Sequence, residues 1–362
     1  MALLAAVSDL HLGDGGDDGS VLYSPDACTH FAQILGQITG GFVQTLVLNG
    51  DLFEACVAER TPDPYGVLGL RQSVIATAKN FFGNLVQTLR VEQLVWVPGN
   101  HDLTVWQALA GASGSLYTET YGRALRPGQP ENPAIAQLFG SISSKIAVAY
   151  PNFVYKPEAG WPFAVFTHGH LFDSLVLNRN ASSIDVDVAR VASGDAWSEI
   201  PQEFDSSPWM KSLVDMTTSR ITKFWCMNLS STEEDIYNYV KRRKIQVQCS
   251  HRPSVPGYRE NNPTNVVLTG DIGWYCNGLM VDEAPVGATG KSPQSYFIKG
   301  HTHDGTSGVI YSIDKTRFAV IDLGGWTTDA EEHKDNIPHT HLAVWDTFPG
   351  PPTCYALNVG KP

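Results

Sequence analysis

The chain has 362 residues, which is enough for a sizeable core and, by length alone, for two domains. Its formal net charge of −12 opposes non-specific binding to nucleic acid or anionic membrane surfaces, and no apolar stretch approaches the roughly 18 residues of a membrane-spanning helix. The 6 cysteines form no C-x-x-C pair and are too sparse for a disulfide framework, which is typical of a reducing compartment.

The first element expected is a strand rather than a signal peptide. Residues 1–7 are apolar, but they lack a basic start and lead directly into Asp9 and His11. We therefore expect a cytoplasmic protein whose first strand ends at two polar side chains.

Strands and helices then alternate. A helix is expected over residues 26–40, a strand over 45–49 leading to Asp51 and Glu54, and a helix over 71–90. A further strand ends in Val-Pro-Gly and presents Asn100, His101 and Asp102. This order predicts βαβαβ units with a largely parallel sheet.

The second half contains two more strands that end in histidines. Residues 163–167 lead to His168, and residues 295–299 lead to His301 and His303. Between them, residues 171–250 carry apolar side chains near helical spacing and a capping box, which predicts an inserted helical cap. The remaining strands, expected at 309–313, 317–323, 341–346 and 354–359, would be antiparallel and complete a two-sheet sandwich.

Five apolar runs thus stop at Asp, Asn or His. Any one of these side chains could have a structural role, such as capping a helix. Oxygen and imidazole ligands that arrive together from several strand ends instead indicate hard or borderline divalent metals, and two such metals form a hydrolase site.

The motifs D-x-H, G-D-x-x-E, G-N-H-D, H-G-H and G-H-T-H, in this order, resemble the calcineurin-like metallophosphoesterase superfamily. The resemblance implies an α/β fold: a two-sheet metallophosphoesterase sandwich of βαβαβ units flanked by helices. It also implies a single metallophosphoesterase domain over residues 1–362, with the helical cap of residues 171–250 inserted within it.

The resemblance further implies two divalent metal ions, which could be Mn, Fe, Zn, Co or Ni. One ion would be held by Asp9, His11 and His303, and Asp51 would bridge the two. The other ion would be held by the side chains of three further residues, namely Asn100, His168 and His301. A metal-bridging hydroxide would attack phosphorus in line.

By the same resemblance, His101 would be the general acid or would stabilise charge in the transition state. A histidine in this role needs a carboxylate to fix its tautomer. Glu54 occupies the partner's position in the calcineurin branch and is preferred, while the adjacent Asp102 competes for the role. Purple acid phosphatases carry a tyrosine ligand at the position of Glu54, so this residue argues against a tyrosinate-bound ferric site.

The function expected is a metal-dependent phosphoester hydrolase, foremost a phosphodiesterase acting on a small-molecule phosphoester. The alternatives are a phosphomonoesterase or a nucleotide-type or UDP-sugar-type pyrophosphatase, and a non-catalytic metal-binding scaffold. The Gly-Trp turn at Trp326 resembles the UDP-diacylglucosamine pyrophosphatases, but these carry Arg where this chain has His101. The oligomeric state is left open.

Overall fold

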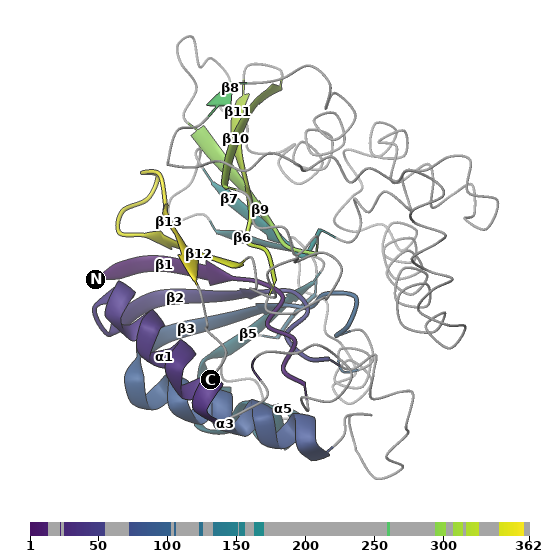
Figure 1. Ribbon diagram of the computed structural model, residues 1–362. Helices are drawn as coiled ribbons and strands as arrows, with labels where there is room; N and C mark the ends of the chain where they lie inside the picture. The colour runs from purple at the N-terminus through teal and green to yellow at the C-terminus, as the bar shows by residue number, and fades with distance from the viewer. Residues whose placement is uncertain are drawn as a thin grey trace, which may run out of the picture.

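The computed structural model describes residues 1–13, 22, 25–54, 72–102, 105, 123–125, 133–150, 152–155, 163–169, 259–260, 294–301, 307–313, 316–325 and 340–357. In this part of the chain two β-sheets pack face to face, and helices cover the outer face of the first sheet (Figure 1). The mixed α/β architecture expected from the sequence is therefore present. None of the helices described is both long and apolar enough to cross a membrane.

The first sheet has a parallel centre with antiparallel edges. Strands β1, β2, β3 and β5 run parallel, β12 pairs antiparallel with β1, and β4 pairs antiparallel with β5. The order across the sheet is β13 (Thr353–Leu357), β12 (Thr340–Trp345), β1 (Ala2–Val7), β2 (Phe42–Asn49), β3 (Arg90–Val97), β5 (Ile146–Tyr150) and β4 (Arg123–Leu125).

The second sheet contains the strands that precede both histidine motifs. Its order is β6 (Asn152–Tyr155), β7 (Ala164–Thr167), β9 (Gln294–Lys299), β11 (Thr316–Asp322), β10 (Ser307–Ile313) and β8 (Arg259–Glu260). Strand β11 is antiparallel to β10, as expected, but parallel to β9. The late strands are therefore antiparallel to one another within each sheet, as β12 and β13 also are, and the parallel pairing of β11 with the earlier strand β9 is an addition to that expectation.

Three helices described lie against the first sheet, on the face away from the second (Figure 1). They are α1 (Pro25–Thr39), α3 (Gln72–Thr88) and the short α5 (Pro133–Phe139), which the 3₁₀ helix η1 (Gly140–Lys145) continues. The expected cap at residues 171–250 lies outside the described residues.

Side-chain alternation along the central strands separates two cores. In β1, Ala5 and Val7 face the helices, whereas Leu4 and Ala6 face the second sheet. Strand β3 repeats the pattern, with Trp96 on the helix side. A strand buried on both faces must be apolar at nearly every position, which explains why these runs are continuous rather than alternating. The packing fixes the positions of the strand ends that carry the polar motifs.

Candidate metal centre

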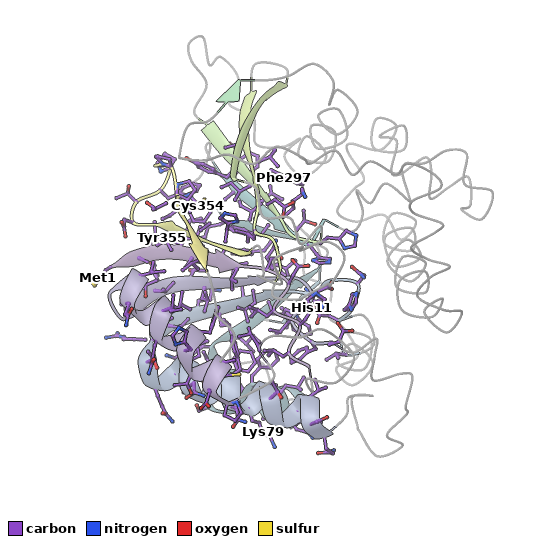
Figure 2. The ribbon with its side chains drawn as sticks, viewed as in Figure 1. Met1, His11, Lys79, Phe297, Cys354 and Tyr355 are labelled. Carbon is purple, nitrogen blue, oxygen red and sulfur yellow. The ribbon has the colours of Figure 1, made fainter. Side chains whose placement is uncertain are left out.

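Five strand ends meet at one edge of the two sheets. The backbone N–H of Asp9 donates to the Gly50 carbonyl oxygen at 3.0 Å, and that of Gly300 donates to the His168 carbonyl oxygen at 2.9 Å. The N–H of His301 donates to both carboxylate oxygens of Asp9, at 3.0 and 3.1 Å. Figure 2 shows His11 at the end of β1 opposite to Met1. The motifs are therefore brought together by backbone hydrogen bonds between loops that follow different strands.

Two groups of ligand atoms share one carboxylate. Asp9, His11 and Asp51 form one group, and Asp51, His168 and His301 form a second. A third group consists of His11, Glu54 and His101, and within each group the ligand atoms lie within 4.8 Å of one another. Asp9, His11, Asp51 and His168 are at most 1% exposed. Since buried carboxylates need cationic or hydrogen-bonding partners, each group could hold a metal ion.

Distances from one carboxylate oxygen of Asp51 show how the two groups that share it divide. Oδ2 of Asp51 lies 3.0 Å from Nε2 of His168 and 3.9 Å from Nε2 of His11. Nε2 of His168 also lies 2.9 Å from Oδ1 of Asn100. Asn100 therefore joins the group of His168.

His101 and Glu54 form the pair expected from the sequence. Nδ1 of His101 lies 2.9 Å from Oε1 of Glu54, and its Nε2 lies 4.0 Å from Oδ2 of Asp51. The side chain of His101 is 21% exposed, whereas that of Glu54 is 4% exposed. The ring of His101 thus contacts a buried carboxylate through Nδ1, and its side chain is partly exposed to solvent.

Asp102 has a different environment from Glu54. Its carboxylate accepts hydrogen bonds from the backbone N–H groups of Leu52, Phe53 and Gly99 at 2.8 to 3.1 Å. It also accepts one from Nε1 of Trp96 at 3.2 Å. These bonds tie the loop after β2 to the loop after β3, so Asp102 holds the two loops in register.

The electrostatics of the centre favour the ionised form of Asp51 and Glu54, whereas burial and the charge of Asp51 raise the pKa of Asp102 to about 6. Burial by itself raises the pKa of Asp51, but the charges of His168, His101 and His11 outweigh it and hold the pKa well below its usual range. Burial likewise raises the pKa of Glu54, and the charge and hydrogen bond of His101 reverse the shift. Burial lowers the pKa of His168, but the charges of Asp51 and Asp9 raise it above its usual value.

Three glycines allow the strand ends to approach one another. A Cβ on Gly99 would lie 2.1 Å from Oδ1 of Asp51, and one on Gly50 would lie 2.1 Å from Nδ1 of His168. A Cβ on Gly300 would lie 2.0 Å from Oδ2 of Asp9. Each glycine therefore belongs to its motif because a side chain there would displace a candidate ligand from a neighbouring strand.

The structure places together nearly all of the residues singled out from the sequence. These are Asp9, His11, Asp51, Glu54, Asn100, His101, Asp102, His168 and His301. His303 lies outside the described residues. The assignment of each residue to a catalytic or metal-binding role stays a prediction.

Two polar residues at strand ends were missed. Oγ of Ser8 contacts both Oδ2 of Asp9 and the carbonyl oxygen of Asn49. Nδ2 of Asn49 donates to the Thr167 carbonyl oxygen at 2.9 Å and so links the two sheets beside His168. The signal in the sequence was a polar residue where an apolar run ends: Ser8 directly follows β1, and Asn49 is the last residue of β2.

Comparison with known proteins adds little. No protein family model matches the chain, and no curated protein does. Among solved structures, a crystal structure of a dimetal phosphatase from Danio rerio aligns over 95% of this chain and 93% of that chain, with 14% sequence identity and a TM-score of 0.36. A likeness this weak supports neither a family nor a function for this chain.

Proposed function

We propose that this chain is a binuclear metallophosphoesterase that hydrolyses phosphodiesters. The observation that carries the proposal is the position of Asp51, which belongs to two of the three groups of candidate ligand atoms and so connects Asp9 and His11 with His168 and His301. A carboxylate has two oxygens and one negative charge, so it suits a place between two cations.

The residues divide between the two ions as the motifs imply. Asp9 and His11 would hold one ion, with His303 as a further ligand. Asn100, His168 and His301 would hold the other. Carboxylate, amide and imidazole donors of this kind accept Mn, Fe, Zn, Co or Ni.

When bound, two divalent ions supply Lewis acidity toward a phosphoryl group and a water of lowered pKa. The chain supplies the rest of the chemistry. Glu54 holds Nδ1 of His101, which leaves Nε2 directed toward the centre, 4.0 Å from Oδ2 of Asp51. When protonated, His101 can stabilise charge on the phosphoryl oxygens or give a proton to the leaving oxygen. Asp102 keeps the loop that carries His101 in place.

The positions of β7 and β9 support a single domain with an insertion. These strands pair in parallel, with Ala164 opposite Tyr296 and Phe166 opposite Ile298, although more than one hundred residues separate them in the sequence. We therefore propose that residues 1–362 form one domain and that residues 171–250 are inserted into it. The cytoplasmic location expected from the sequence stays a prediction.

The test is a comparison of two substrates with one protein. The protein is stripped of metal with a chelator and reloaded with manganese, and turnover of a generic aryl phosphodiester and an aryl phosphomonoester is measured side by side. We expect metal-dependent turnover with preference for the diester. Preference for the monoester would contradict the proposal and favour a phosphomonoesterase. Binding of metal without turnover of any phosphoester or pyrophosphate would favour a metal-binding scaffold.

Two substitutions test the roles of the residues in the same assay. Asp51→Asn removes the shared charge and should abolish occupancy by two ions. His101→Ala should leave both ions bound and slow turnover by about 10²- to 10⁴-fold, the usual contribution of a general acid. Near wild-type turnover in either variant would contradict the assignment.

A further inference from the structure

The carboxylate of Glu54 lies between two imidazoles, and only one of them was expected to contact it. Oε1 is 2.9 Å from Nδ1 of His101, and Oε2 is 2.7 Å from Nδ1 of His11. The two rings meet edge to face, with centroids 4.9 Å apart and an interplanar angle of 83°. One buried side chain therefore contacts both a candidate metal ligand and the candidate acid.

The backbone explains why Glu54 reaches His11. Beyond the ends of β1 and β2 the two segments continue side by side: the N–H of His11 donates to the Asp51 carbonyl oxygen at 2.9 Å, and that of Leu12 donates to the Leu52 carbonyl oxygen at 2.9 Å. Leu12 also forms a parallel bridge with Phe53. This pairing sets the D-x-H motif alongside the G-D-x-x-E motif, so that its histidine faces the glutamate.

The contacts determine the tautomer of both rings. An ionised carboxylate can only accept hydrogen bonds, so each Nδ1 must carry a hydrogen. In each neutral ring Nε2 is then the nitrogen that carries no hydrogen. Both Nε2 atoms point toward Oδ2 of Asp51, at 3.9 Å for His11 and 4.0 Å for His101. His11 is thus presented in the form that can bind a metal.

We propose that Glu54 is a positioning residue for His11 as well as for His101, and that it sets the affinity of the ion held by Asp9 and His11. The inference rests on the proposed function, since it needs metal ions at the centre. It goes beyond that function because it makes one carboxylate responsible both for metal binding and for orienting the acid. A partner that fixes a metal-binding histidine typically contributes 10- to 100-fold in metal affinity.

Glu54→Gln is the sharpest probe, because glutamine offers one acceptor oxygen and one donor nitrogen. The single oxygen of glutamine must serve Nδ1–H of both rings, as Oε2 of Glu54 could at 2.7 Å from His11 and 3.0 Å from His101, but without the negative charge that holds them. A ring that turns to accept from the NH₂ group instead takes the tautomer with hydrogen on Nε2, which cannot bind a metal through that atom. We expect manganese titration by calorimetry to show one of the two ions bound about 10- to 100-fold more weakly than in the wild type.

Two control variants separate this effect from other causes. In the first, Glu92→Gln, the exposed carboxylate whose Oε1 lies 3.6 Å from Nη2 of Arg90 is removed. This variant should leave manganese affinity unchanged. His101→Ala keeps the contact between Glu54 and His11 and should also keep both ions. Wild-type affinity in Glu54→Gln, or an equal loss in His101→Ala, would overturn the proposal.

A second measurement needs no loaded enzyme. Nitrogen-15 spectra of histidine-labelled, metal-free wild-type protein should show His11 and His101 with hydrogen on Nδ1, the signals being assigned by their loss in His11→Ala and His101→Ala. A hydrogen on Nε2 of neutral His11 would overturn the proposal, even if Glu54→Gln did not fold. Failure of the proposed function would be distinguishable, because it would appear as wild-type protein that binds manganese without turning over a phosphoester.

Discussion

Four candidate ligands adopt a backbone conformation that residues other than glycine rarely take. The φ angle is 52° at Asp9, 43° at His11, 42° at Asp51 and 72° at His301, and these are the positive values found at non-glycine residues in the part of the chain that is described. Such conformations cost about 1–3 kcal/mol each and persist only when the surroundings enforce them. Here hydrogen bonds between the loops enforce them, and the strain is concentrated where ligand side chains must converge.

At this scale Gly99→Ala is expected to damage the centre. The new Cβ would lie 2.1 Å from Oδ1 and 2.5 Å from the backbone nitrogen of Asp51. Overpacking of this kind costs about 1–3 kcal/mol in the free energy of unfolding, and displacement of Asp51 should also weaken metal binding. Chemical denaturation and manganese titration of the variant would measure the two effects.

Gly83→Ala is the matched control for that substitution. Gly83 lies within α3, and a Cβ there would meet nothing within 4 Å. Alanine at a helix interior should raise the free energy of unfolding by about 0.5–1 kcal/mol and leave metal affinity unchanged. If Gly99→Ala and Gly83→Ala changed the free energy of unfolding and the manganese affinity alike, the loop after β3 would not need its glycine.

At the scale of the elements, contacts made by side chains that are not candidate ligands hold the loops of the first sheet in place. Asp102 accepts hydrogen bonds from both the loop after β2 and Trp96 in β3. The ring of Trp96 packs in turn against Phe53 and Phe139, with centroids 5.6 and 5.8 Å apart. The helix-side core is thereby connected directly to the loop that carries Asn100 and His101.

Asn49→Ala should loosen the connection between the sheets. It removes the hydrogen bond from β2 to the carbonyl oxygen of Thr167, the residue before His168. We expect a loss of about 1 kcal/mol in the free energy of unfolding and weaker binding of the ion assigned to His168. Thermal unfolding with and without manganese would measure both.

Gln44→Ala provides the comparison on the same strand. Gln44 is exposed in β2, and its substitution by alanine removes a side-chain amide like that of Asn49. A change in unfolding free energy within about 0.5 kcal/mol and unchanged manganese affinity are expected, as for other surface positions. If Asn49→Ala behaved in the same way, the hydrogen bond between the sheets would contribute nothing to the centre.

At the scale of the whole molecule, the centre makes the stability of metal-free protein depend on pH. The charge of His101 and the hydrogen bonds of His101 and His11 outweigh the effect of burial and lower the pKa of Glu54 below its usual value of 4.5. The folded state then binds fewer protons than the unfolded state, so the stabilisation is present above about pH 4.5 and is lost as the pH falls toward the folded-state pKa.

This dependence should be weaker in Glu54→Gln. Between about pH 5 and pH 3, the free energy of unfolding measured in chelator should fall more steeply for the wild type than for the variant. Asp51, whose pKa is also lowered, contributes a decline common to both proteins. Identical slopes would mean that the carboxyl of Glu54 titrates alike in the folded and unfolded states.

Much of the fold could be predicted from local pattern, because a continuous apolar run that ends in Gly or Pro has few structures available to it. The strands before Asp9, Asp51, Asn100, His168 and His301 lie within a few residues of where the sequence predicts them. Helices α1 and α3 end within two residues of their expected ends at 40 and 90. The chemical types of the candidate ligands could also be predicted, since they follow the strands directly.

Only the tertiary structure decided which side chains meet. The contact of Glu54 with His11 spans 43 positions in the sequence, and that of Asn49 with Thr167 spans 118. Both depend on how strands pair and sheets pack, which no local pattern records. The same holds for the parallel pairing of β11 with β9 and for the clash that a side chain at Gly99 would cause. Local propensity acts over a few neighbouring residues, whereas the geometry of this centre is set by packing between strands distant in the chain.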